Sequence, residues 1–218
     1  MNIFSMQRSF ELEILDEQDL PDEQMVAIHR DLDRIHAFLG VPQALISLLR
    51  RDPLPVRKVL DVGCGHGGML RKIQKSMGVE VVGVDLRPPA NQAGLGFSIL
   101  QANVVHDQLP TADVAISVCF AHHLSEDEVI GMIRNVGRSC RRFVILDLVR
   151  SPVPLALFRT FVWPFVTEVN GKDGYQSIRR SFTAAEFQRI AERALDGRGE
   201  VRVRVAPFEV RQIVDIRY

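Results

Sequence analysis

A glycine-rich turn within residues 59–70, VLDVGCGHGGML, constrains the fold more than any other part of the sequence. The apolar run before it is typical of a buried strand, and residues 67–77 after it have the spacing of a helix. Glycines at such a strand-to-helix turn let backbone N–H groups and the helix N-terminus face a ligand without obstruction by Cβ atoms. The segment therefore predicts a ligand-binding turn at the end of a strand.

Short β-branched runs alternate with helical stretches after residue 57. The strand-like runs are KVLDVG, VEVVGVD, FSILQA, DVAISVCF and RRFVILDLV, and the helical stretches include residues 125–137 and TAAEFQRIAERALDG. Strands that are apolar throughout and separated by helices indicate a mostly parallel sheet covered on both faces. The fold class is therefore α/β.

Both ends of the chain depart from this alternation. The ending EVRVRVAPFEVRQIVDIRY has two alternating strands joined by a short turn at Ala206 and Pro207, which favours an antiparallel hairpin on the sheet edge. At the other end, two helices are expected between residues 21 and 50, separated by Gly40 and Pro42.

The length of 218 residues suits one domain with a full-sized core. We expect residues 1–55 to be a helical segment that forms part of a lid over an acceptor site. Residues 56–218 would be the ligand-binding domain, and residues 151–182 a helical, aromatic insertion over the active site.

Two acids beside the turn indicate the charge of the ligand. Gly63, Gly65 and Gly68 match G-x-G-x-x-G, and the second acid, Asp85, follows Gly65 by twenty residues, as in a dinucleotide-binding unit. However, Asp61 would repel a pyrophosphate and would favour a ligand with an amino group or a sulfonium. S-adenosylmethionine (SAM) carries both groups, and its ribose hydroxyls can donate hydrogen bonds to an acid that closes the second strand.

Three motifs carry a resemblance to a known family. VLDVGCGHGG resembles the first motif of class I SAM-dependent methyltransferases, VVGVDLRP their second, and DVAISVCFAHHLSEDE their fourth-strand motif. The resemblance covers roughly residues 57–150 and, through the final hairpin, reaches the end of the chain. It implies a Rossmann-like class I methyltransferase fold, with a mostly parallel seven-stranded sheet, helices on both faces and a C-terminal antiparallel hairpin.

The resemblance also implies a SAM site. The glycine turn would line the methionine part of SAM, Asp85 would bind both ribose hydroxyls, and Leu86 would pack on adenine. Where the family commonly has an acid for the adenine amino group, this chain has Ala102 and Asn103; the Asn103 carbonyl oxygen could accept from that group, and Asp107 is a nearby alternative. The expected cofactor-binding residues are Asp61, Gly63, Cys64, Gly65, Asp85, Leu86, Ala102, Asn103, Cys119 and Phe120.

Residues just after the fourth and fifth strands should meet the methyl acceptor, because ligands of open α/β sheets bind at the carboxyl ends of the strands. His122 and His123 are candidate catalytic residues, since an imidazole can accept a proton from an acidic hydroxyl. The alternative is that the pair shapes the pocket while Ser125 and Glu128 cap the following helix. Asp147 is a candidate base or a group that orients the acceptor.

The insertion indicates what kind of acceptor enters the site. Its aromatic residues could pack over a flat or lipophilic molecule, or form the core of the insertion itself: Phe158, Phe161, Trp163, Phe165 and Tyr175. This arrangement resembles small-molecule methyltransferases of ubiquinone/menaquinone biosynthesis and of bacterial polyketide pathways. It implies O- or C-methylation of a phenol or quinone precursor, and a place in secondary metabolism.

Composition narrows the partners and the compartment. Lys+Arg and Asp+Glu both total 27, so no basic face is expected for nucleic acid. The three cysteines lack C-x-x-C spacing and the start has no signal-peptide pattern, which favours a cytoplasmic protein. No transmembrane segment is expected, although residues 151–166 could touch a membrane surface. We also expect no metal site, and the oligomeric state stays open.

Two other functions are also compatible with the sequence. A nicotinamide-dependent reductase would share the glycines but would leave Asp61 and the reversed last strand unexplained. A non-catalytic SAM-binding protein is the other alternative, because the sequence contains no obligatory nucleophile.

Overall fold

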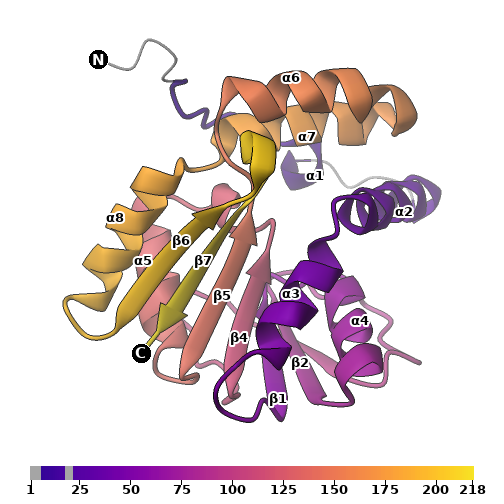
Figure 1. The fold of residues 1–218 in the computed structure, drawn as a ribbon. Helices are drawn as coiled ribbons and strands as arrows, with labels where there is room; N and C mark the ends of the chain where they lie inside the picture. The colour runs from indigo at the N-terminus through magenta and orange to yellow at the C-terminus, as the bar shows by residue number, and fades with distance from the viewer. Residues whose placement is uncertain (1–5, 18–21) are drawn as a thin grey trace.

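A seven-stranded sheet forms the centre of the computed structural model, which describes residues 6–17 and 22–218 (Figure 1). The strands follow the order β3-β2-β1-β4-β5-β7-β6. Their bounds are β1 Lys58–Val62, β2 Glu80–Asp85, β3 Ser98–Gln101, β4 Val114–Val118, β5 Arg142–Asp147, β6 Glu200–Val205 and β7 Gln212–Arg217. The first five pair in parallel, whereas β7 runs antiparallel to both β5 and β6. This confirms the predicted fold class and the reversed last strand.

Helices cover the sheet on both faces because the central strands are apolar on both. In β5, Phe143 and Ile145 pack into a cluster with α5 (Glu126–Val136) and α8 (Ala184–Leu195), while Val144 and Leu146 pack into a second cluster with α3 (Val41–Arg50) and α4 (Gly68–Met77). This alternation follows from the two-residue period of a strand. The helices are α1 Ile14–Glu17, α2 Asp22–Phe38, α3 Val41–Arg50, α4 Gly68–Met77, α5 Glu126–Val136, α6 Pro152–Phe161, α7 Glu168–Arg180 and α8 Ala184–Leu195.

Helix starts agree with local sequence signals. Ser125 and Glu128 form the expected capping box, in which each side chain bonds the backbone N–H of the other. Thr183 and Glu186 do the same for α8. Three short 3-10 turns also occur among the described residues: η1 Ala121–His123, η2 Trp163–Phe165 and η3 Pro207–Glu209.

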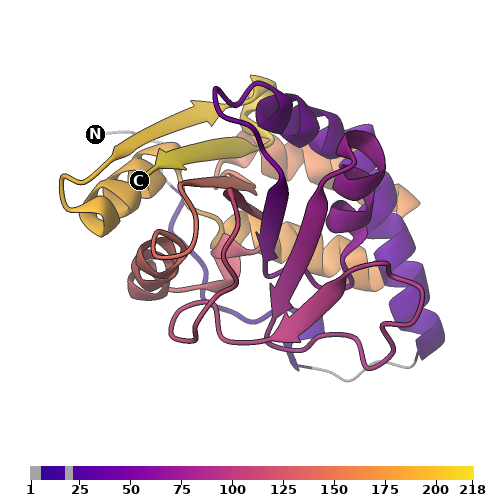
Figure 2. The ribbon, with the colours of Figure 1, turned by 90° about the horizontal axis from the view of Figure 1, so that it is seen from below.

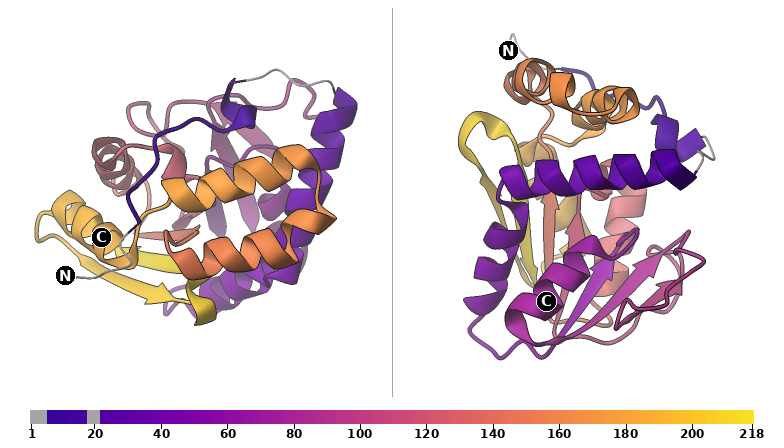
Figure 3. Two further views of the ribbon diagram at one scale, coloured as in Figure 1. Left: turned by 90° about the horizontal axis from the view of Figure 1, so that it is seen from above. Right: turned by 90° about the vertical axis from the view of Figure 1, so that its right-hand side faces the viewer.

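Two helices that follow β5 lie across the carboxyl ends of the strands, as the view from above shows (Figure 3). We call residues 152–180, which comprise α6, η2 and α7, the lid. Helix α2 lies beside the lid, and the described N-terminal residues run along α7, where the Ser9 amide donates to the Arg179 carbonyl at 3.0 Å. Segments distant in sequence therefore meet above the sheet.

The C-terminal hairpin closes one edge of the sheet, opposite β3 (Figure 2). Its connection is longer than the predicted turn at Ala206 and Pro207, because η3 intervenes and β7 begins only at Gln212. Phe208 and Glu209 adopt left-handed φ angles of 58° and 55° in this connection. Such angles are strained for side-chain-bearing residues, and η3 packs against α6 of the lid.

Membrane crossing is not supported by the described helices. In residues 6–17 and 22–218, every helix is too short or too polar to span a bilayer.

Candidate active site

The glycine turn and the end of β2 are joined by Asp85. One Asp85 carboxylate oxygen accepts the Gly65 amide at 2.7 Å, and the other accepts the Arg87 amide at 2.9 Å. Gly63 has a φ of 72°, and a Cβ there would overlap the Phe120 ring, so the turn can pass this close to β4 only without a side chain. The turn is therefore fixed in shape by its neighbours before any ligand binds.

Asp61 is a buried acid without a partner in the described structure. Its side chain is 2% exposed, and its Oδ1 atom has no hydrogen-bond donor among the described residues. Burial, together with the negative charge of Asp85, raises the pKa of the Asp61 carboxyl well above its ordinary value. A cation or hydrogen-bond donor bound beside Asp61 would satisfy this oxygen, so the residue fits the positively charged methionine part of SAM.

A cavity of about 780 Å³ extends from the glycine turn to the lid. Its floor is formed at the ends of β1, β4 and β5, and its walls come from α2, α6 and α7. Most of the lining surface is apolar and includes Leu32, Ile35, Val118, Leu148, Phe158 and Ile178. The volume is within the usual range for small-molecule sites.

The structure divides the sequence-predicted cofactor residues into two groups. Five line the cavity: Asp61, Gly63, Cys64, Gly65 and Cys119. Five lie outside its lining: Asp85, Leu86, Ala102, Asn103 and Phe120. Burial raises the pKa of the Cys64 and Cys119 thiols, which keeps both in the neutral form. Their assignment to cofactor binding remains a prediction.

The region expected to meet adenine is held by its own hydrogen bonds. The Asn103 side-chain oxygen accepts the Val105 amide at 2.9 Å, and the Asn103 amide donates to Asp107 at 2.7 Å. Both polar side chains that the sequence offers for the adenine amino group therefore already support the loop. Leu86 is 58% exposed, which leaves an apolar surface beside Asp85.

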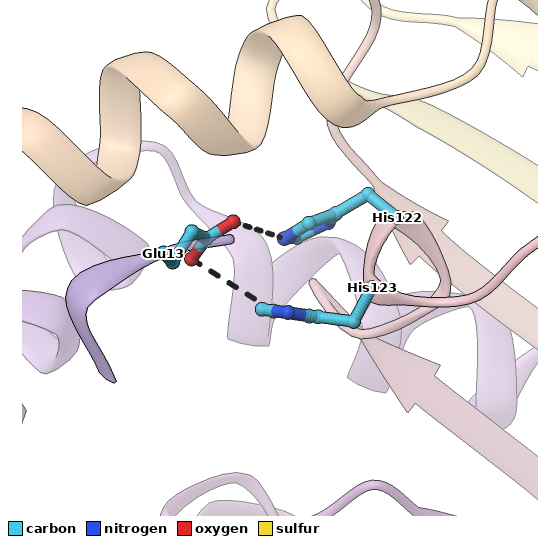
Figure 4. A group of neighbouring side chains, drawn as sticks. All are labelled: Glu13, His122 and His123. Carbon is cyan, nitrogen blue, oxygen red and sulfur yellow. Dashed lines mark ion pairs between the residues drawn. The ribbon is translucent and has the colours of Figure 1, made fainter. Parts of the chain in front are cut away.

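His122, His123 and Glu13 form a cluster at the other end of the cavity (Figure 4). His122 Nδ1 lies 2.7 Å from Asp147 Oδ1, and its Nε2 lies 3.6 Å from Glu13 Oε1. His123 Nε2 lies 4.0 Å from the second Glu13 oxygen, and the two imidazole rings are tilted by 34° with their centroids 4.3 Å apart. The adjacent histidines therefore both reach the same carboxylate.

Asp147 orients His122 and does not face the cavity. It is 1% exposed and accepts the His122 ring N–H, the His122 amide at 3.0 Å and the Leu148 amide at 2.8 Å. The sequence offered Asp147 as a base or as a group that orients the acceptor; both roles remain predictions, and the contacts of its carboxylate are with His122 and Leu148. When Nδ1 of His122 carries the proton donated to Asp147, Nε2 of the neutral ring carries none. The approach of Nε2 to the Glu13 carboxylate is then favourable only when a second proton lies between these two atoms.

These residues are also metal-binding types. The possible ligand atoms of Glu13, His122 and His123 all lie within 4.8 Å of one another. However, the Arg180 guanidinium lies 3.7 Å from Glu13 Oε1, and the Ser177 hydroxyl donates to the same oxygen at 2.9 Å. Because positive charge and a donor already face this carboxylate, we interpret the cluster as one that shares protons.

Sequence reasoning missed several residues that the fold brings to the cavity. They are Glu13, His36, His66, Asp173 and Arg211. Glu13 lies in a segment without a motif, far from the histidines in sequence, and no local pattern could have indicated its position. Burial, with a smaller contribution from Lys72, lowers the pKa of His36 on α2, so its neutral form is favoured in the cavity wall.

A family model described as a methyltransferase domain matches residues 59–142. This range begins at β1 and ends at the first residue of β5, so it includes the glycine turn, both acids and the two histidines. No curated protein matches the sequence at a significant level.

Solved structures share the fold at low sequence identity. The plantazolicin methyltransferase BpumL, solved with a desmethylplantazolicin analogue and S-adenosylhomocysteine (SAH), is 14% identical; the match covers 90% of each chain with a TM-score of 0.69. A putative O-methyltransferase from Nostoc punctiforme is 13% identical, with a TM-score of 0.62, over 88% of this chain and 60% of that chain. The pyocyanin biosynthetic protein PhzM is 17% identical, with a TM-score of 0.59, over 89% and 61%.

Proposed function

We propose that this chain, which has the class I methyltransferase fold, is a SAM-dependent methyltransferase. Its methyl acceptor would be a small, largely apolar molecule with an acidic hydroxyl or an activated carbon. The observation that carries this proposal is the mostly apolar cavity of about 780 Å³ that joins the glycine turn to the histidine cluster. Because the cofactor would share this volume, the space that remains favours a small aromatic acceptor. Two proteins of similar fold, the plantazolicin methyltransferase BpumL and the pyocyanin biosynthetic protein PhzM, support a role in secondary metabolism.

The glycine-turn end of the cavity would hold the cofactor. Asp61 would accept from the positively charged methionine part, Asp85 would accept from the ribose hydroxyls, and the exposed Leu86 would pack against adenine. SAM supplies an activated methyl group when bound, so positioning of donor and acceptor provides much of the acceleration.

The histidine-cluster end would bind the acceptor and take its proton. His123 would meet the acceptor, because its side chain is 27% exposed, compared with 3% for His122 and 6% for Glu13. Glu13 would receive or share the proton, and Asp147 would hold His122 in the orientation that completes the cluster. General-base assistance of this kind typically contributes about 10²–10⁴-fold.

The described part of residues 1–55 and the lid would close the acceptor site. The segment around Glu13 is fixed to the lid through Asp173, whose carboxylate accepts the Ile14 amide at 2.8 Å and the Leu15 amide at 3.1 Å. Because a protonated cluster next to bulk water would exchange freely, this closure would keep proton transfer between acceptor and cluster.

Methyl transfer to defined acceptors tests the proposal. The purified chain would be incubated with SAM carrying a labelled methyl group and with phenols, catechols and naphthols of increasing size, and SAH formation and labelled product would be measured. We expect turnover with at least one class, and none with Asp85→Ala at the same SAM concentration. Tight SAH binding without turnover on any of these acceptors would instead support the non-catalytic alternative.

A further inference from the structure

Arg211 brings a positive charge to the cavity wall, where none of the described carboxylates pairs with it. It precedes β7, and one of its terminal nitrogens donates to the Leu39 carbonyl at the end of α2. Its Nε atom is buried and has no hydrogen-bond partner in the described structure. Among residues 6–17 and 22–218, no carboxylate forms an ion pair with the Arg211 guanidinium, so this positive group lacks a counter-ion there.

Apart from Asp61, each acid that lines the cavity interacts with groups other than Arg211. Asp33 pairs with Lys72, and Asp173 accepts the two amides at the start of α1. Glu13 faces Arg180 and the histidines. An unpaired buried donor is costly, and a protein keeps such a group most readily where a ligand completes it.

Arg211 is linked through its sequence neighbour to the histidine-cluster end of the cavity. The next residue, Gln212, is the register partner of Asp147, which orients His122. The guanidinium also lowers the pKa of the Cys119 thiol, against the larger upward effect of burial, so its field reaches the residue that follows β4. Cys119 itself has a left-handed φ of 51°, a strained angle of the kind often found beside functional sites.

We propose that Arg211 is a carboxylate-binding residue of this cavity and pairs with the carboxylate of a bound small molecule. The planar guanidinium has a buried Nε–H without a partner and can meet two carboxylate oxygens, which gives orientation as well as charge. The inference deepens the proposed function and rests on it, because it takes the cavity as the site of cofactor and acceptor.

Two molecules could supply this carboxylate. One is the amino-acid end of the cofactor, and the other is an acidic group on the methyl acceptor. The chemistry at Arg211 is the same in both cases, and paired probes distinguish them.

The first arm compares SAH with 5′-methylthioadenosine, which has the same nucleoside and a thioether but no carboxylate. Calorimetry would measure both on the wild-type chain and on Arg211→Met. If the cofactor supplies the carboxylate, we expect Arg211→Met to weaken SAH by roughly 10- to 100-fold and methylthioadenosine by less than about twofold.

The second arm uses the SAH-saturated chain with benzoate and its uncharged analogue benzamide, and with octanoate and octanamide. If the acceptor supplies the carboxylate, we expect each acid to bind about tenfold or more tightly than its amide, and Arg211→Met to remove that difference.

Arg204→Met is the matched control, because Arg204 lies on the exposed edge strand β6 and loses the same charge away from the cavity. Thermal unfolding would be measured for each variant. If Arg211→Met changes neither the SAH-to-methylthioadenosine ratio nor either acid-to-amide ratio, the proposal is overturned. Failure of methyl transfer with intact SAH binding would count against the proposed function while leaving the first arm valid.

Discussion

The two ends of the cavity are built in different ways. The glycine-turn end comes from neighbouring segments of sequence, since Asp61, Gly65 and Asp85 belong to one strand–helix–strand unit. The histidine-cluster end is assembled from distant segments, because Glu13, His122 and Arg180 come from the N-terminal region, the end of β4 and the lid. The first end can therefore be recognised as a motif, whereas the second exists only in the folded chain.

This difference predicts a separation of effects. Changes at the glycine-turn end should alter cofactor affinity or stability, and changes at the histidine cluster should alter turnover with little effect on cofactor affinity. A variant that affects both ends equally would contradict the division.

The largest effect is expected for Asp85→Ala. The change removes the proposed acceptor of two ribose hydroxyls and releases the Gly65 amide that shapes the turn. We expect SAH affinity to fall about 100- to 1000-fold, because two hydrogen bonds to a charged group are lost. Calorimetry would measure this, with Asp85→Asn as the control that keeps one oxygen acceptor. Unchanged affinity in Asp85→Ala would remove the ribose role from the proposal.

Gly63→Ala should destabilise the fold at the same end. The new Cβ would require a left-handed φ of 72° and would overlap the Phe120 ring. We expect a loss of about 2–4 kcal/mol in the free energy of unfolding, measured by chemical denaturation. In a Phe120→Ala background the overlap is absent, so adding Gly63→Ala there should cost only the backbone strain. Equal costs in both backgrounds would show that the close approach does not matter.

Asp147→Asn tests the assembled end. The amide can keep one hydrogen bond to the His122 backbone but no longer stabilises the donated ring proton as a carboxylate does. We expect kcat to fall about 100-fold, with SAH affinity within about twofold of wild type. The dependence of kcat on pH should also change, which a purely structural role would not cause. A comparable loss of SAH affinity would mean that the two ends are not separable.

The same contrast between local and distant segments explains which parts of the fold and of the site could be predicted from the sequence. The mostly parallel sheet and the reversed β7 were predictable because they depend on local alternation and on a resemblance carried by local motifs. The Ala206–Pro207 turn was predicted too short, since η3 forms to pack against α6, a contact that lies far away in sequence. Glu13 and Arg211 were missed for that reason too: neither lies in a motif, and each reaches the cavity only after the lid and the β5–β7 pair have formed.

Asp61→Asn is expected to have the smallest effect. It should increase the stability of the ligand-free fold and decrease the affinity for SAM. The folded chain raises the pKa of this carboxyl above the ordinary value of 3.8, so the folded state binds its proton more tightly than the unfolded state does. Stability contributed by the site is therefore present below pH 3.8 and is lost as the pH rises toward the folded-state pKa. An amide cannot ionise, so the ligand-free variant should be about 1–2 kcal/mol more stable than wild type at neutral pH.

The same amide removes the negative charge proposed to face the methionine part of the cofactor. SAM affinity should therefore fall in Asp61→Asn while the ligand-free melting temperature rises, and the stability gain should vanish when both chains are compared near pH 3.8. Thermal unfolding with and without SAM, at both pH values, measures the change in ligand-free stability and the change in SAM affinity in one series. A stability gain accompanied by unchanged SAM affinity would mean that the buried charge is not held for a cation, and the glycine-turn end would then need another ligand.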